Sequence, residues 1–121
     1  MTQEYKEKLK QKMNSFVHFV YDATLNFPKQ EIYSSVSQFR RAALSVVLNY
    51  IEGYARRRIA VQYNFFEISY GSLKEARFLL KFSLERGYIT DEEFQRGDVL
   101  ADEIGAMLWK ELTDISNSMN K

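Results

Sequence analysis

Apolar residues recur along the chain at intervals of three and four positions, the spacing that places side chains on one face of an α-helix. In the first such stretch, Leu9, Met13 and Phe16 follow this spacing. The same periodicity holds over four segments, so we expect an all-α protein. The segments predict helices at residues 3–26, 31–55, 59–86 and 91–118.

Residues that break or cap helices separate these segments. Pro28 ends the first, because proline lacks an amide hydrogen and biases the preceding residue away from helix. The pattern loses its phase at residues 55–58, "ARRR", which is the candidate turn between the second and third helices. Gly87 is the candidate C-terminal cap of the third helix, and Thr90 is the candidate N-cap of the fourth.

Four amphipathic helices of about 24 to 28 residues, joined by short connections, predict an antiparallel up-and-down four-helix bundle. Short connections force consecutive helices to run in opposite directions. With 121 residues, the chain is expected to form one domain, residues 1–121. A domain of this size buries roughly two-thirds of the surface that its unfolded chain exposes.

Composition argues against catalysis. The chain has no cysteine and one histidine, so disulfides, thiol chemistry and thiolate metal sites are excluded. His18 has no partner histidine, and the Glu-x-x-His pairs of di-metal helical bundles are missing. No glycine-rich phosphate loop and no nucleophile with an adjacent base is present. We therefore expect no enzymatic activity, no cofactor and no metal.

The hydropathy of the chain does not indicate a membrane protein. No window reaches about 18 uninterrupted apolar residues, the length that a membrane span requires. The N-terminal stretch "MTQEYKEKLKQK" is charged where a signal peptide would be apolar. We expect a cytoplasmic protein without a membrane partner.

The net charge of +1 hides an uneven distribution. Residues 1–60 contain ten Lys/Arg against five Asp/Glu, whereas residues 61–121 contain seven against eleven. These opposite charges would favour attraction between helices, between subunits or toward a polyanion.

Polar side chains interrupt the apolar run of the second helix. Their spacing of three or four residues places them on one stripe. Either this polar stripe faces solvent, or it packs against another helix or subunit with the Glu52 carboxylate and the Asn49 amide in buried hydrogen bonds. The polar stripe consists of Gln38, Arg41, Ser45, Asn49 and Glu52, with Gly53 beside it.

Two glycines lie inside predicted helices. Glycine there costs about 1 kcal/mol relative to alanine. Gly53 therefore indicates either the close approach of a partner backbone or the start of the helix terminus, and Gly71 also suggests a close approach.

Two segments, "SQFRRAALSVVLNYIEGYARR" and "FFEISYGSLKEARFLL…RGYI", carry a family resemblance. They resemble the four-helix bundle family that includes the protein encoded in intervening sequences of bacterial large-subunit ribosomal RNA genes. The chain departs from that family's usual pattern at Val47, where proline is common, at Tyr50 and Ile51, where Ile-Ala is usual, and at Ser69, where alanine is usual. The matching positions are Ser37, Gln38, Arg40, Arg41, Ala42, Ser45, Val46, Asn49, Glu52, Gly53, Phe66, Gly71, Ser72, Leu73 and Glu75.

The resemblance implies a bundle that assembles into a barrel-like homopentamer with a basic surface. A related branch, the accessory variability protein of diversity-generating retroelements, is similar in fold and associates with a reverse transcriptase and with nucleic acid. The resemblance defines the fold more closely than it defines the function.

Two functions follow as hypotheses. The first is a non-enzymatic, oligomeric protein that binds nucleic acid, RNA or DNA with RNA preferred, because arginine suits bidentate phosphate contact. The second is a protein-interaction scaffold or accessory subunit, for example for a reverse transcriptase, with Tyr54, Tyr63 and Tyr70 as docking aromatics. Alternatively, Arg40 or Arg41 forms a structural ion pair with Glu52 or with the acidic half. The candidate nucleic-acid-binding residues are Arg40, Arg41, Arg56, Arg57, Arg58, Lys8 and Lys12.

Overall fold

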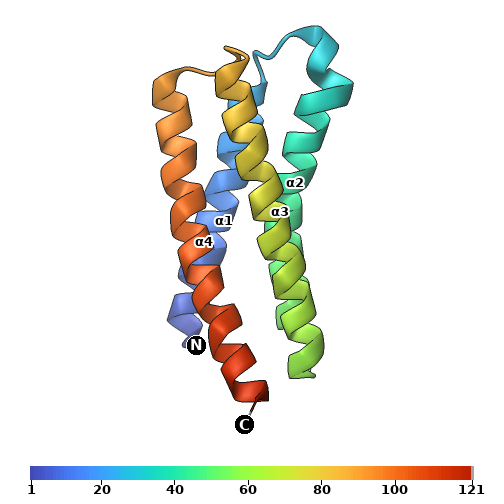
Figure 1. The fold of residues 1–121 in the computed structure, drawn as a ribbon, viewed down its shortest axis with the longest axis vertical. Helices are drawn as coiled ribbons and strands as arrows, with labels where there is room; N and C mark the ends of the chain where they lie inside the picture. Colours follow the sequence, from blue (N-terminus) through green and yellow to red (C-terminus); the bar gives the residue numbers. More distant parts are fainter. Residues whose placement is uncertain (121) are drawn as a thin grey trace.

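The computed structural model describes residues 1–120 and contains four long α-helices and no strand over that range (Figure 1). The four helices predicted from the apolar spacing are all present, so the all-α prediction is confirmed. Their bounds are α1 Gln3–Thr24, α2 Ser37–Tyr54, α3 Ile59–Glu85 and α4 Asp91–Met119.

Each helix packs against two others: α1 against α2 and α4, and α3 against α2 and α4. In Figure 1 the chain reverses direction at each connection. The α1–α2 and α3–α4 connections lie at one end of the molecule, and the α2–α3 turn lies at the other end with both chain termini. None of the helices within residues 1–120 has an apolar stretch long enough to cross a membrane.

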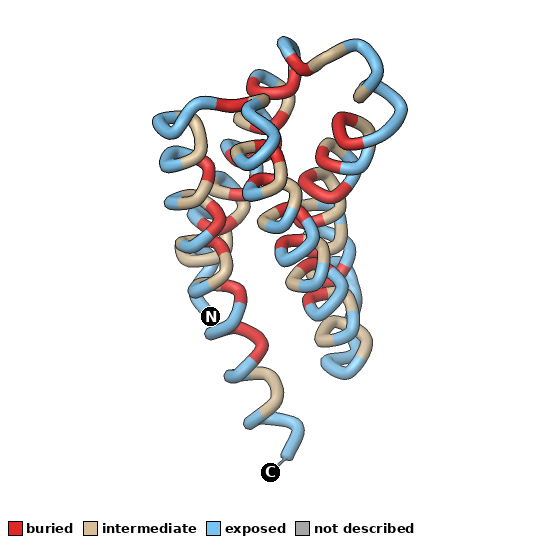
Figure 2. The backbone as a smooth tube through the Cα atoms, turned by 45° about the horizontal axis from the view of Figure 1, so that its top comes forward, coloured by how far each residue is buried: buried red, intermediate tan, exposed pale blue. Residues whose placement is uncertain are grey.

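The core is built from the apolar stripes of all four helices. Figure 2 shows buried turns recurring along each helix, whereas the connections and chain ends are mostly exposed. The largest fully buried side chains include Phe16 of α1, Phe39 and Tyr50 of α2, Phe66 of α3 and Ile104 of α4. Burial of a large apolar side chain stabilises a fold by about 1.5–3 kcal/mol, so these stripes hold the helices together.

Buried hydroxyl groups link α2 to its neighbours. The Ser69 hydroxyl donates to the Val46 carbonyl oxygen at 2.6 Å, and the Tyr50 hydroxyl donates to the Glu111 carboxylate of α4. Both donors stand where the family usually has an aliphatic residue, and both find an acceptor. These departures therefore add hydrogen bonds between helices, and neither the Ser69 nor the Tyr50 hydroxyl is left unpaired.

The segment before α2 differs from the prediction, which placed a continuous helix from residue 31. Residues Lys29–Glu31 form a 3₁₀ turn and Ile32–Val36 a π-helical turn, in which Ser34 has non-helical φ −125° and ψ −107°. Regular α-helix begins only at Ser37. The connection is anchored by the buried Phe27, whose ring lies 5.1 Å from that of Tyr88. This tertiary contact fixes where the chain must turn, which local helix propensity does not record.

The ends of α3 and α4 form as the sequence predicts. Gly87 has φ +75°, and the Gly87 and Tyr88 amides donate back to Leu84 and Ser83 at 3.0 and 2.9 Å, which closes the α3 C-terminus. The Thr90 hydroxyl accepts from the Glu93 amide at 3.1 Å, and the Glu93 carboxylate accepts from the Thr90 amide at 2.9 Å. This reciprocal capping box starts α4.

Candidate nucleic-acid interface

The α2–α3 turn carries three consecutive arginines, here called the arginine turn (Arg56, Arg57 and Arg58), and all three are exposed. The Arg56 guanidinium pairs with the exposed Glu52 carboxylate one helical turn earlier and lies 5.2 Å from the Phe65 ring centroid. Within residues 1–120, no carboxylate pairs with Arg57 or Arg58. The turn therefore presents a concentrated positive charge at one end of the molecule.

Gly53 allows the start of α3 to pack closely against the end of α2, next to the arginine turn. A Cβ atom built on Gly53 would lie 2.7 Å from the Phe66 ring and 3.1 Å from Phe65 Cβ. The Gly53 carbonyl also accepts from the Gln62 side-chain amide at 3.2 Å and from the Arg56 amide at 3.1 Å. Both interpretations of Gly53 apply: it lies in the last turn of α2, and α3 approaches it closely. Gly71 differs, because no other group lies within 4 Å of a Cβ there, so no close approach exists within one chain.

Arg40 does not share the exposure of the arginine turn. Its Nε donates to the Thr24 hydroxyl at 2.9 Å, its Nη2 donates to the Tyr21 carbonyl at 3.3 Å, and its guanidinium lies 4.5 Å from the Tyr21 ring centroid. These contacts join α2 to the end of α1, and none is an ion pair with Glu52 or with the acidic half. Arg40 is therefore engaged in packing the bundle.

The remaining predicted cations do not gather into one surface. Arg41 is exposed, but it lies fifteen residues from Arg56 along α2, a rise of about 22 Å. Lys8 is exposed on α1, whereas Lys12 is half-buried in an ion pair with Glu103. The arginine turn is thus the place where three predicted residues are consecutive in the chain and all exposed.

A cation that the sequence reasoning did not select lies close to the arginine turn. The Lys6 ammonium sits 4.0 Å from the ring centroid of Tyr54, the last residue of α2. The sequence shows that Lys6 and Lys10 share one face of a helix. It does not show that this face of α1 meets the end of α2, which only the structure reveals.

The polar stripe divides into exposed and half-buried parts. Gln38, Arg41 and Glu52 are exposed, so a buried Glu52 does not occur within one chain. In the middle, the Ser45 and Ser72 hydroxyls are hydrogen bonded at 2.7 Å across α2 and α3, and the Asn49 amide nitrogen donates to the Ser45 carbonyl at 2.9 Å. Within a single chain the stripe is therefore mainly a surface feature with a serine contact to α3.

A buried carboxylate close to this end of the bundle was missed by the sequence reasoning. Glu111 of α4 is 2% exposed and accepts from the Tyr50 hydroxyl. Burial raises the pKa of Glu111, and the Tyr50 hydrogen bond and the Lys6 charge only partly oppose this. Burial, together with the hydrogen bond to Glu111, also raises the pKa of Tyr50. The pair connects α2 to α4 through the core.

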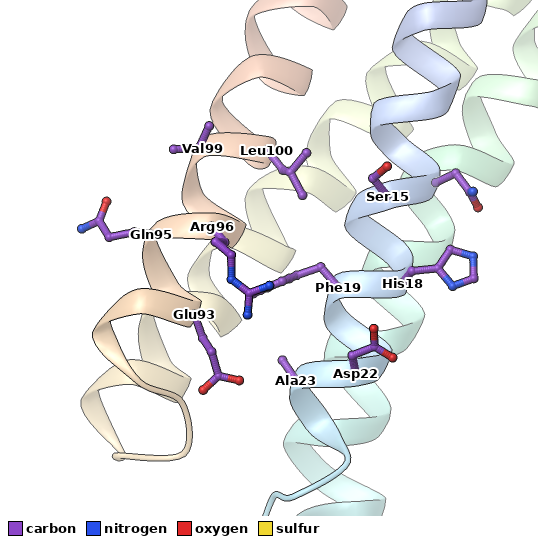
Figure 3. A pocket seen from close by; sticks show the side chains of 11 residues that line it. Ser15, His18, Phe19, Asp22, Ala23, Glu93, Gln95, Arg96, Val99 and Leu100 are labelled. Carbon is purple, nitrogen blue, oxygen red and sulfur yellow. The ribbon is translucent and has the colours of Figure 1, made fainter.

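An open hollow of about 780 Å³ lies between α1 and α4. Figure 3 shows Arg96 of α4 reaching toward Phe19 of α1, and the guanidinium lies 5.8 Å from the ring centroid. His18, Asp22 and Glu93 also line this hollow, but no hydrogen bond within residues 1–120 joins them into an acid–base pair. Over the same residues, no group of three His, Asp or Glu side chains is placed to hold a metal ion.

Fold and site together define a small all-helical protein with a cationic turn between its second and third helices. Residues 6–110 match the 23S rRNA-intervening sequence protein family, and the chain belongs to that family. This confirms the resemblance carried by the two motif segments. No curated protein matches the chain.

The fold recurs in a solved structure. A crystal structure from Bacteroides thetaiotaomicron, described as a protein with unknown function from the S23 ribosomal protein family, matches with a TM-score of 0.77 and 21% sequence identity. The match covers 86% of this chain and 97% of that chain. At this identity the likeness shows the fold alone.

Proposed function

We propose that this protein is a non-enzymatic RNA-binding protein that contacts phosphate groups through the arginine turn. The observation that supports the proposal is the exposure of Arg56, Arg57 and Arg58 together, with only Arg56 paired to a carboxylate among residues 1–120. Arginine presents a planar fork of donors that matches two phosphate oxygens. Lys6, adjacent at Tyr54, adds a further charge to this surface.

The proposal includes the assembly that the family resemblance implies. The chain forms an antiparallel up-and-down four-helix bundle, and copies of the bundle associate into a ring-like homo-oligomer, a pentamer. Large exposed apolar side chains on α2 and α3 support association, among them Leu48, Ile68 and Phe78. A ring would repeat the arginine turn around one rim, so a long RNA strand would meet several turns at once.

The test is a fluorescence titration of labelled structured RNA, single-stranded RNA and duplex DNA at two salt concentrations. Three phosphate contacts per subunit to a single strand give a slope of log affinity against log salt of about −2. The R56E/R57E/R58E variant should lose binding to all three ligands and flatten this slope. RNA should bind more tightly than duplex DNA.

A charge-matched control separates the arginine turn from a general effect of net charge. Lys29, Lys81 and Arg86 are exposed. Lys29 belongs to the α1–α2 connection, and Lys81 and Arg86 to the end of α3 that leads into the α3–α4 connection. Both connections lie at the end of the molecule opposite the arginine turn (Figure 1). The K29E/K81E/R86E variant makes the same change in net charge and should bind RNA as the wild type does, apart from a small long-range effect. Absence of binding at low salt, or equal losses in the two variants, would overturn the proposal.

An accessory role toward a protein is the second candidate function. The exposed apolar side chains of α2 and α3 favour it, whereas Tyr54, Tyr63 and Tyr70, the predicted docking aromatics, are each half-buried. A reverse transcriptase is the partner suggested by the related branch. Size-exclusion chromatography of the mixed proteins tests this role: Leu48→Glu and Ile68→Glu should abolish co-elution if this surface carries the contact.

A further inference from the structure

A groove between α3 and α4 is lined by aromatic side chains from both helices. The Tyr70 ring of α3 lies 5.4 Å from the Trp109 ring of α4, and Trp109 is 58% exposed. A hollow of about 260 Å³ opens on one side of this pair toward Tyr63, and a second of about 320 Å³ opens on the other side toward Arg77. Tyr70 and Trp109 line both hollows, so they form a ridge between two shallow pockets.

The aromatic groups of this groove retain free hydrogen-bond donors. Across residues 1–120, no hydrogen bond uses the Tyr63 hydroxyl, the Tyr70 hydroxyl or the Trp109 indole nitrogen. Each therefore combines an apolar ring with an unused polar tip. This combination suits a ligand that offers both flat apolar groups and carbonyl oxygens.

The charge around the groove is mixed, with an acidic excess on α4, and does not favour a polyanion as the ligand. Helix α4 carries eight Asp/Glu against two Lys/Arg, and α3 carries three of each. Arg77, at the mouth of one hollow, is already paired with Asp98 at 3.1 Å and Asp102 at 3.7 Å. The exposed Lys74 lines the same hollow, with its ammonium 5.2 Å from the Tyr70 ring centroid. Glu67 is exposed in the other hollow with no cationic partner among residues 1–120. Charge complementarity therefore favours a ligand that is neutral along its length and basic at the Glu67 end.

We propose that this groove binds an extended proline-rich segment of a protein partner, with a Lys or Arg of that segment beside Glu67. The proposal is independent of RNA binding at the arginine turn. A polyproline II segment supplies flat apolar rings for Tyr70 and Trp109. It also presents backbone carbonyls that its own chain leaves unpaired, which the three free donors would satisfy.

The spacing of the two hollows agrees with this ligand. The α3 residues that line them, Tyr63 to Tyr70 and Tyr70 to Arg77, are centred seven residues apart, a rise of about 10 Å. In polyproline II, residues i and i+3 project on the same side about 9 Å apart. Two prolines three positions apart would therefore enter the two hollows, one on each side of the ridge.

Trp109 is the only tryptophan of the chain, so its emission reports directly on the groove. The probe is a decaproline peptide ending in arginine, titrated against the full chain while Trp109 fluorescence is followed. A Gly-Ser peptide of the same length with the same arginine is the control, and single-stranded oligouridylate is the third ligand. We expect a saturable shift with decaproline-arginine at peptide concentrations where the Gly-Ser peptide gives none.

Variants assign the binding to the groove. Glu67→Gln, at an exposed position, should remove the preference for the arginine-ended peptide over uncharged decaproline. Tyr70→Ala should weaken binding at least tenfold, whereas Phe78→Ala, at a more exposed aromatic of α3 outside the groove, should leave binding unchanged. Circular dichroism of Tyr70→Ala distinguishes lost contact from lost fold, and Glu67→Gln tests the site without altering the core.

Three outcomes would overturn the proposal. These are no change in Trp109 emission with proline peptides, equal binding of the Gly-Ser peptide, or tighter binding of oligouridylate, which would make the groove a nucleic-acid site. The R56E/R57E/R58E variant should bind decaproline-arginine as the wild type does. Retention of peptide binding by that variant, with RNA binding lost, separates the groove from the arginine turn.

Discussion

Gly53 and Gly71 both stand within helices, but a methyl group added to each would meet different surroundings. At Gly53 it would press on the Phe66 ring at 2.7 Å, and at Gly71 it would meet no group within 4 Å. We expect Gly53→Ala to lower the free energy of unfolding by about 1–2 kcal/mol, since overpacking outweighs the gain in helix propensity. We expect Gly71→Ala to raise it by up to about 1 kcal/mol. Urea midpoints of the two variants check this.

The opposite result at Gly71 would also be informative. If Gly71→Ala destabilises the protein, the surface around Gly71 is packed against another copy of the chain. If Gly53→Ala is neutral, Phe66 has moved aside, and the close contact does not restrain the end of α2.

Glu111 gives the stability of the protein a particular dependence on pH. Its folded-state pKa is raised above its ordinary value of 4.5 by burial, so the folded state binds the proton more tightly than the unfolded state does. The stability from protonated Glu111 is therefore fully present below about pH 4.5 and is lost as pH rises through the folded-state pKa. Glu111→Gln keeps an acceptor for Tyr50 and removes the titration.

The measurement is the free energy of unfolding of wild type and Glu111→Gln across pH 4 to 8. The advantage of the variant over the wild type should grow as pH rises and then level off. Because other carboxylates titrate in both proteins, the difference between the two curves isolates Glu111. A difference that does not vary with pH would mean that Glu111 is not desolvated.

At the scale of single residues, the sequence showed which side chains are cationic, but not which of them pack against a neighbouring helix and which face solvent. Arg40 and Arg41 are adjacent and were both assigned to phosphate binding, but Arg40 donates to Thr24 and Tyr21 while Arg41 stays exposed. Which of two neighbouring arginines faces the next helix depends on the rotation of α2 about its axis. Helical periodicity gives that rotation only to within about one residue, or 100°, so the two roles could not be separated in advance.

Among the elements, α4 depends on its capping box. Thr90→Ala removes the acceptor for the Glu93 amide and should lower the free energy of unfolding by about 1 kcal/mol. The matched variant is Thr2→Ala, because the Thr2 hydroxyl accepts from the Tyr5 amide at 3.1 Å in the same geometry. Thr2→Ala should lower the free energy of unfolding by less than Thr90→Ala does, because the first turn of α1 lies at the chain end, where local unfolding requires little free energy. Thermal unfolding of both variants checks the order, and equal losses would contradict it.

The helices themselves were predictable because their apolar spacing and their caps agree. The segment before α2 was not, because the connection is held by a contact between residues distant in sequence, and regular α-helix begins only at Ser37. Phe27 is buried against Tyr88, sixty-one positions further along the chain, and this contact sets where the chain leaves α1. Local sequence carries no record of such a contact, so a continuous helix was the natural expectation.

At the scale of the whole molecule, charge and aromatic groups are distributed to different regions. The arginine turn lies at the end opposite the α1–α2 and α3–α4 connections, while the acidic α4 contributes one wall of the Tyr70–Trp109 groove. The sequence revealed the imbalance of charge between its halves. It did not reveal that Tyr70 and Trp109, thirty-nine positions apart, form one ridge, because that depends on the register between α3 and α4.

The assembly proposed for the whole molecule has a consequence that needs no knowledge of its interface. If several arginine turns lie on one ring, a strand long enough to reach two turns rebinds at the second before leaving the first. A single-stranded RNA of forty nucleotides should then bind at least about 1,000-fold more tightly than one of four nucleotides, because the gain from rebinding multiplies the statistical gain of a longer strand. A monomer would gain only the statistical factor of its additional overlapping binding positions, about 40-fold for this pair of lengths, and its salt slope would stay near −2.

Affinity against RNA length, measured beside sedimentation velocity, separates these cases. A ring sediments as a species whose mass is a multiple of the 14.3 kDa of one chain, five times that mass for a pentamer. The slope of its log affinity against log salt becomes steeper as the RNA lengthens. The R56E/R57E/R58E variant should keep the sedimentation coefficient and lose the length dependence, because the arginine turn contacts phosphate and lies outside the apolar surface of α2 and α3. A 14.3 kDa species with only the statistical gain would refute the ring and leave phosphate binding by the single chain intact. A ring with no length dependence would mean that its arginine turns point away from a common path.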